Sequence, residues 1–271
     1  MVHPDTPRQR SAKRSGSSDR TNRTAGRRTP IRLQLHDNFE LRSDDRELQL
    51  PLGTQRLVAF LALHPGMLTR SFVAGSLWLD VPEERAAANL RSALWRARPS
   101  RLSVVVATRT HVSLDAAVWV DHHHAVEAAH RVLESNEVED DDLRLRVGEL
   151  LPDWYDEWVT VERERFRLLR LHALEVACER LAARGRFGEA VEAGMTAVAA
   201  EPLRESAHRA LVRVHLAAGN WWEAIHQYES YKGLLEQQLD LPPSDEMEAL
   251  IRPIRKSARR PAVSLGRAGG R

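Results

Sequence analysis

The chain has 271 residues, which is enough for two compact domains with extensions at the ends. Its single cysteine excludes an internal disulfide and favours a reducing compartment. No apolar run approaches the roughly 18–20 residues that a membrane-spanning helix needs, and the run after residue 30 is too polar for a secretory signal. The sequence therefore predicts a cytoplasmic protein that does not contact a membrane.

The formal net charge of +2 is unevenly distributed along the chain. Residues 1–30 carry eight Arg and Lys against Asp5 and Asp19, a net of +6, whereas the remainder carries a net of −4. Because this segment has almost no apolar side chains, we interpret it as a disordered arm, and residues 257–271 as a disordered tail. Two hypotheses for the arm stay open: a passive extension, or a phosphate-binding segment that speeds encounter with DNA.

From residue 31 the pattern predicts a small α/β domain. Apolar and polar residues first alternate, as in short antiparallel strands. Three helices are expected next: one after Gly53, a short one capped by Thr69 or Ser71, and one over about 82–98. Two strands, near 103–106 and 112–114, follow as a hairpin. Strands, three helices and a hairpin are the order of a winged helix-turn-helix domain, which we assign to residues 31–120.

The third of these helices is the candidate for contacts to DNA bases. In a winged helix its outer face lies in the major groove, while its inner face packs on the core. Leu90, Leu94 and Ala97 share one face and are predicted to be buried. The four charged residues between 85 and 98 are all arginines with no acid between them, which favours DNA binding. An ordinary solvated face is the alternative, since charged outer faces are common.

The contacts expected from this helix follow from side-chain chemistry. Asn89, Ser92 and Arg96 are predicted to contact bases, because Asn bonds adenine and Arg bonds guanine through paired hydrogen bonds. Arginines on the flanks and on the hairpin are predicted to contact phosphates. Trp95 packs either on the hairpin or on a partner. The full set of candidate DNA-binding residues is Arg85, Asn89, Arg91, Ser92, Trp95, Arg96, Arg98 and Arg109.

The second half of the chain contains an internal repeat of 34 residues, the period of tetratricopeptide repeats. Phe187 and Trp221 are equivalent positions in this repeat, and both are predicted to be buried between paired helices. Trp222 cannot share that face, so we predict that it is exposed and belongs to a partner surface. Residues 121–256 are thus expected to form an all-helical domain, and the fold class is mainly α. The matching residues are Ala183, Gly185, Glu189 and Ala190 with Ala217, Gly219, Glu223 and Ala224.

Signatures of catalysis and of metal binding are weak. The run of histidines 122–124 with His130 suggests a metal site, but consecutive helical side chains diverge and do not share one ion well. Asp121 before them is predicted to be a helix N-cap. The sequence has no phosphate-binding loop, no G-x-S-x-G and no H-E-x-x-H, and Cys178 is predicted to be a buried structural thiol. We expect neither an enzyme nor a bound cofactor.

Two stretches carry a resemblance to a known family. Residues 150–165, which begin Leu-Leu-Pro-Asp-Trp-Tyr-Asp-Glu-Trp-Val, closely resemble the opening of the bacterial transcriptional activator domain. Residues 201–211 and 219–228 resemble its repeats. The front half is similar to the DNA-binding half of the Streptomyces antibiotic regulatory proteins. The resemblance implies sequence-specific binding to promoter DNA, as a dimer or in tandem on direct repeats, and activation of a gene cluster through contact with RNA polymerase.

A second hypothesis stays open beside the transcription activator. The front domain is nearly neutral, with eleven Arg against nine acids over residues 32–115. A helical-repeat adaptor whose front domain does not bind DNA would have such a charge balance. Binding to DNA that falls steeply with salt distinguishes the two hypotheses.

Overall fold

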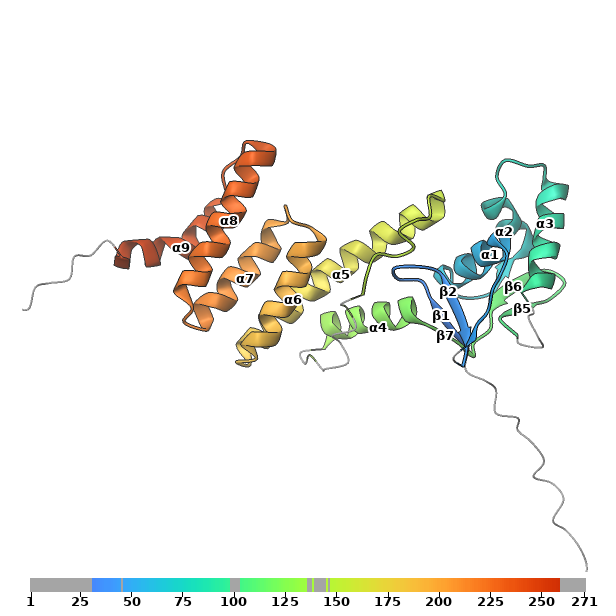
Figure 1. Ribbon diagram of the computed structural model, residues 1–271, viewed down its shortest axis with the longest axis horizontal. Helices are drawn as coiled ribbons and strands as arrows, with labels where there is room; N and C mark the ends of the chain where they lie inside the picture. The colour runs from blue at the N-terminus through green and yellow to red at the C-terminus, as the bar shows by residue number, and fades with distance from the viewer. Residues whose placement is uncertain are drawn as a thin grey trace, which may run out of the picture.

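A computed structural model describes residues 31–44, 46–97, 103–135, 138, 145 and 147–258, with the backbone alone for 256–258. The predicted arm, Arg98 and most of the predicted tail lie outside these residues. The described chain is elongated, with the strands and first helices at one end and the helical repeats at the other (Figure 1). Within these ranges no helix is both long and apolar enough to cross a membrane.

The front of the chain begins with a four-stranded sheet of order β3-β2-β1-β7. β1 pairs antiparallel with β2 and parallel with β7, so this sheet brings the first and last strands of the front domain side by side. Ile31 and Leu33 are buried while their neighbours are exposed, which is the alternation that the sequence indicated. The strands are β1 (Ile31–Gln34), β2 (Glu40–Ser43), β3 (Arg46–Glu47) and β7 (Val118–Val120).

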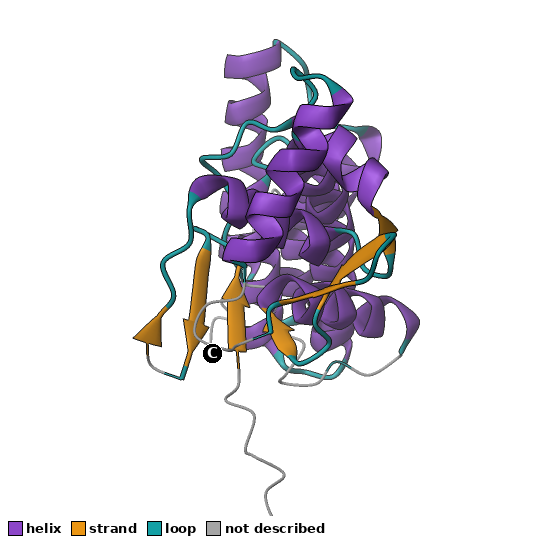
Figure 2. Ribbon diagram, turned by 90° about the vertical axis from the view of Figure 1, so that its right-hand side faces the viewer, coloured by secondary structure: helices purple, strands orange, loops and turns teal. Residues whose placement is uncertain are grey.

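Three helices and a second small sheet complete the front domain (Figure 2). Thr69 caps the second helix, since its hydroxyl accepts the N–H of Phe72 at 3.3 Å. The second sheet has the order β4-β6-β5, and its β5–β6 hairpin follows the third helix as a wing. The predicted order of strands, three helices and a hairpin is confirmed. The elements are α1 (Leu52–Leu63), β4 (Leu68–Thr69), α2 (Arg70–Leu77), α3 (Glu83–Arg96), β5 (Val105–Ala107) and β6 (His111–Leu114).

The second half of the chain is all-helical as predicted, and two of its helices begin at the positions that the sequence repeat relates. Helices α6 and α8 begin at equivalent positions, and each follows a glycine with φ of 75°, Gly185 and Gly219. Such a left-handed residue ends a helix at little cost only when it is glycine. The helices are α4 (Asp121–Glu134), α5 (Glu157–Ala183), α6 (Phe187–Ala200), α7 (Glu205–Ala217), α8 (Trp221–Leu239) and α9 (Asp245–Ala258).

Helix α5 contributes to two hydrophobic cores. Val159 near its start packs in the front core with Leu150 and Leu151, whereas Leu171 and Leu181 lie in the core of the repeats. Arg163 ties the preceding segment to this helix, because its guanidinium donates to the carbonyls of residues 150, 151 and 154 at 2.9, 2.5 and 2.9 Å. Residues 150–159, assigned from sequence to the second domain, thus pack against the first.

Asp121 does not act as the predicted N-cap. Helix α4 begins at Asp121 itself, and Val120 is its N-cap residue without a side-chain bond. The Asp121 carboxylate accepts the N–H of His122 at 2.7 Å in its own helix, and also the backbone N–H groups of Leu35 at 3.0 Å and His36 at 3.1 Å. It thereby satisfies donors at the end of β1, a role that depends on a partner 86 residues away and that local sequence does not show.

The predicted burial of Trp221 is wrong, although its repeat position is correct. Trp221 is 57% exposed, whereas the equivalent Phe187 is half-buried against the core of the repeats. The buried register of α8 runs through Ala224, Tyr228 and Leu235, with Trp221 one turn before it. Helix periodicity fixes the face of a residue, but whether a neighbour reaches the first turn depends on tertiary packing.

These two positions offer a matched test of repeat packing. Phe187→Ala should lower the free energy of unfolding by about 2–4 kcal/mol, because it removes aromatic contacts from the core. Trp221→Ala should cost less than about 1 kcal/mol, as for an exposed residue. Urea unfolding of both variants checks this, and equal losses would contradict the exposed position of Trp221.

Two histidines meet where the front sheet, α4 and α5 join. His36 and His122 are buried, with His122 Nδ1 3.3 Å from His36 Nε2, and both rings lie against Phe166. Desolvation by burial, followed by repulsion from His36, lowers the pKa of His122 to about 3. Desolvation also lowers the pKa of His36, against an opposing effect of Asp121. Both rings are therefore neutral in the folded protein near pH 7.

This pair should make stability depend on pH. In the unfolded chain a histidine titrates near 6.5, so below that pH the unfolded state binds more protons than the folded state. The contribution of the neutral histidines to the free energy of unfolding is present in full above pH 6.5 and is lost as the pH falls towards 3. Between about pH 7.5 and about pH 5, His122→Gln should reduce this loss by up to about 2 kcal/mol. His130→Gln, at an exposed ring, is the control, and equal pH dependence in all three proteins would refute the assignment.

Candidate nucleic-acid interface

Helix α3 presents its predicted DNA-binding side chains to solvent. Its inner face is buried as expected, with Leu90 2%, Leu94 8% and Ala97 0% exposed. Arg85, Arg91, Ser92 and Arg96 are exposed and Asn89 is half-buried. Trp95 is 79% exposed, so no neighbour within the described part of the chain buries it. The predicted phase of the helix is therefore correct for its core face.

The wing and the start of α2 extend this surface. Arg109 lies in the turn of the β5–β6 hairpin, and Arg70 at the start of α2 is bonded to the same turn. The N–H of Arg70 donates to Thr110 O at 2.9 Å, and its guanidinium donates to Thr108 O at 3.3 Å. A cleft of about 280 Å³ brings Arg70, Arg91 and Arg109 together, with Glu83 also on its wall.

Arg70 is a candidate phosphate contact that the sequence reasoning missed. A signal for it was present, since Thr69 was one of the two residues expected to cap the helix, and a cap at Thr69 places the next residue at the helix N-terminus, where anions bind favourably. The pairing of β4 with β6, which carries this N-terminus to the wing, is a tertiary contact. Only the folded chain shows that Arg70, Arg91 and Arg109 share one cleft.

The arginines near α3 differ from those of the helical repeats in their partners. Within the described residues, Arg85, Arg91, Arg96 and Arg109 have no ion pair with an acid. In the repeats, by contrast, several arginines bind carboxylates: Arg204–Glu175 at 2.6 Å, Arg213–Glu179 at 2.8 Å and Arg167–Glu164 at 2.8 Å. Four arginines without an ion pair among the described residues thus lie on α3 and the wing, beside Glu83 and Glu84 at the start of α3, in a front domain that is nearly neutral overall.

A second exposed surface lies at the start of α8, far from α3 along the molecule (Figure 1). Trp222 is 68% exposed, as predicted, and its ring stacks on His226 with centroids 5.1 Å apart. Trp221 beside it is also exposed. An exposed aromatic cluster of this kind is unusual on a solvated helix and is a common feature of protein interfaces.

The remaining candidate groups have structural partners. His123 Nε2 lies 2.6 Å from Ala62 O, and the His124 ring stacks on Trp119, so the histidine run points to separate neighbours. Cys178 is buried as predicted, and desolvation raises the pKa of its thiol to about 12. A thiol with this pKa is not a nucleophile near pH 7.

Comparison with known families identifies the larger part of the chain. The bacterial transcriptional activator domain family matches residues 114–255, and the chain belongs to this family, as its sequence resemblance indicated. The match covers β7, all the helices from α4 to α8 and most of α9. Comparison with curated proteins gives no match.

A solved structure has a similar fold. It is Mycobacterium tuberculosis EmbR in complex with a low-affinity phosphopeptide, 17% identical, with a TM-score of 0.60. The match covers 86% of this chain and 66% of that chain, so this chain spans slightly less than two thirds of EmbR. The likeness extends over most of this chain and supports the predicted fold class, in which small sheets with helices precede an all-helical region.

Proposed function

We propose that this protein is a sequence-specific transcription activator that binds promoter DNA through α3 and its wing. The observation that carries the proposal is the exposed set of arginines without acidic partners on α3 and the wing. An arginine already bound to a carboxylate gains little from a further bond to a DNA phosphate. The guanidinium groups on α3 and the wing, by contrast, are available for DNA; they belong to Arg85, Arg91, Arg96 and Arg109. Membership of the bacterial transcriptional activator domain family supports the same function.

In this proposal α3 enters the major groove. Asn89, Ser92 and Arg96 read base edges, and Trp95 lies beside them. Arg70, Arg91 and Arg109 hold the phosphate backbone from their shared cleft, which fixes the position of the helix without reading sequence. Arg85 supplies a further contact near the start of the helix, and the contact predicted for Arg98 falls outside the described residues. The dimeric or tandem binding implied by the family would place two such helices on repeated half-sites.

Activation is proposed to occur through the helical repeats. Trp222 and His226 form an exposed aromatic surface on α8, at the opposite end from α3, where RNA polymerase can be contacted without displacing DNA. The regulated genes are proposed to form a cluster of secondary metabolism, as in the Streptomyces antibiotic regulatory proteins, and the protein to act in the cytoplasm without catalysing a reaction.

DNA binding is tested directly on the upstream region of the neighbouring genes. Fluorescence anisotropy with this DNA and with a scrambled duplex, over a series of salt concentrations, should show specific binding that weakens steeply as salt rises. Equal, weak binding to both duplexes would contradict the proposal and favour the adaptor hypothesis.

Arg96 should contribute to base recognition. Arg96→Ala is expected to weaken specific binding by about 1–3 kcal/mol and to relax preference at one base position, because it removes a paired hydrogen bond to a base. Arg165→Ala is the matched control: Arg165 is exposed on α5 and bonded to Glu162 at 3.0 Å, away from α3.

The phosphate contacts should behave differently from Arg96. Arg70→Ala is expected to weaken binding to all duplexes equally and to reduce the salt slope by about one. If Arg96→Ala had the effect of the Arg165→Ala control, the proposed base contact would be wrong.

Trp222 should affect activation and not DNA binding. Trp222→Ala is expected to leave the melting temperature and the DNA affinity close to those of the parent, because the side chain is exposed and far from α3. A reporter driven by the bound promoter should lose most of its activation, as for an aromatic hot spot of an interface. Full activation by this variant would remove Trp222 from the proposed polymerase contact.

A further inference from the structure

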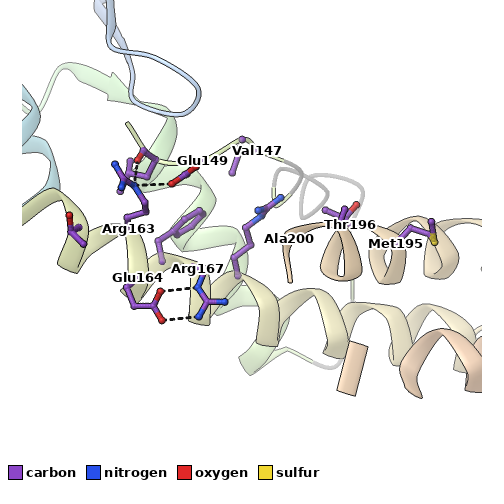
Figure 3. A pocket seen from close by; sticks show the side chains of 14 residues that line it. Val147, Glu149, Arg163, Glu164, Arg167, Met195, Thr196 and Ala200 are labelled. Carbon is purple, nitrogen blue, oxygen red and sulfur yellow. Dashed lines mark hydrogen bonds and ion pairs between the residues drawn. The ribbon is translucent and has the colours of Figure 1, made fainter. Parts of the chain in front are cut away.

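A large cavity lies between the two halves of the molecule, away from α3 and the aromatic surface of α8. It has a volume of about 1000 Å³ and lies between residues 147–150, the first half of α5 and the last turns of α6 (Figure 3). This volume is at the upper end of the range for small-molecule sites and far exceeds that of a phosphate or sulfate ion.

Three arginines on successive turns of α5 line the cavity. Arg163 is bound to backbone carbonyls and to Glu149 at 3.1 Å, and Arg167 is bound to Glu164 at 2.8 Å (Figure 3). The two acids on the wall are therefore already neutralised. The third arginine, Arg170, has no carboxylate within ion-pair distance among the described residues.

Arg170 is held in place but incompletely bonded. Its Nε donates to Leu145 O at 2.6 Å, and its two terminal nitrogens have no acceptor in the described ranges. Desolvation by burial lowers the pKa of Arg170, with only a partial opposing effect from Asp37. A half-buried guanidinium with two unbonded donors would gain from an anion placed in the cavity.

The rest of the wall is mainly apolar. The cavity is also lined by Leu150 from the segment before α5, by Phe166 from α5, and by Met195 and Ala199 from α6. Met195 is 51% exposed, although it is a large apolar side chain next to a repeat core. Apolar walls with a few placed polar groups are characteristic of sites for organic ligands.

We propose that this cavity binds a low-mass organic anion, with a carboxylate, sulfonate or phosphate on Arg170 and an apolar body between Phe166 and α6. The ligand would contact Leu150, which is bridged to His36 after β1, and Ala199, which belongs to the repeats. Binding would therefore stabilise the contact between the two halves. Its chemistry is independent of the DNA-binding surface.

The proposal is tested with anilinonaphthalene sulfonate, an aromatic anion that fluoresces in apolar sites, and with phenylnaphthylamine as its neutral counterpart. The full chain is titrated without DNA. Ala199→Trp fills the cavity from an exposed position on α6, and Arg170→Met removes the charge but keeps an apolar stem. Arg213→Met, at an exposed arginine of α7, is the control for loss of one positive charge. Circular dichroism confirms that each variant is folded.

We expect one saturable site for the sulfonate in the parent and in Arg213→Met, and a higher melting temperature on binding. Ala199→Trp should weaken both probes by roughly tenfold or more, whereas Arg170→Met should weaken only the sulfonate to that extent. Unchanged binding in Ala199→Trp would place the probe elsewhere and overturn the proposal. Equal affinity of Arg170→Met and the parent for the sulfonate would overturn the assignment of an anion. Because no DNA is present, either failure leaves the proposed activator function unaffected.

Discussion

The architecture depends on helix α5, which belongs to two cores at once. Its first turns pack with the front domain and its later turns with the repeats, so a single 27-residue helix spans the junction. A continuous helix of this length is stiff, because bending it would break backbone hydrogen bonds. Arg163 adds a second connection by holding three carbonyls of the preceding segment against the helix.

Two further contacts close the same junction. Asp121 at the start of α4 binds the end of β1, and Gly148 lies so close to Asp37 that a Cβ on it would overlap the Asp37 carboxylate. The segment 147–151 therefore lies directly against the end of the front sheet. These contacts join the helical half to the front sheet, and the proposed DNA-binding and partner surfaces lie at separate ends of the molecule.

The sequence predicted those features that are local. Gly185 and Gly219 show the repeat because a left-handed helix end is a property of one residue and its neighbours. Leu90 and Leu94 show the core face of α3 because periodicity alone determines it. The family resemblance of residues 150–165 depended on a local motif as well, and the family match confirmed it.

Features that depend on distant residues were not accessible in this way. The role of Asp121 requires the end of β1, and the cleft of Arg70, Arg91 and Arg109 requires the pairing of β4 with β6. The exposure of Trp221 depends on how far the neighbouring helices extend. The arginine-lined cavity arises where three separate segments meet, and each arginine, considered by itself in the sequence, is an ordinary residue of an amphipathic helix.

The fixed geometry of the two halves can be measured with spin labels. Cysteines at Ser92 on α3 and Gln237 on α8 are exposed and can be labelled, while the native Cys178 is buried and its raised pKa protects it from reaction. Double electron–electron resonance should give one narrow distance distribution, as expected for two domains joined through a common helix. A broad distribution would show that the halves move independently and would contradict the account.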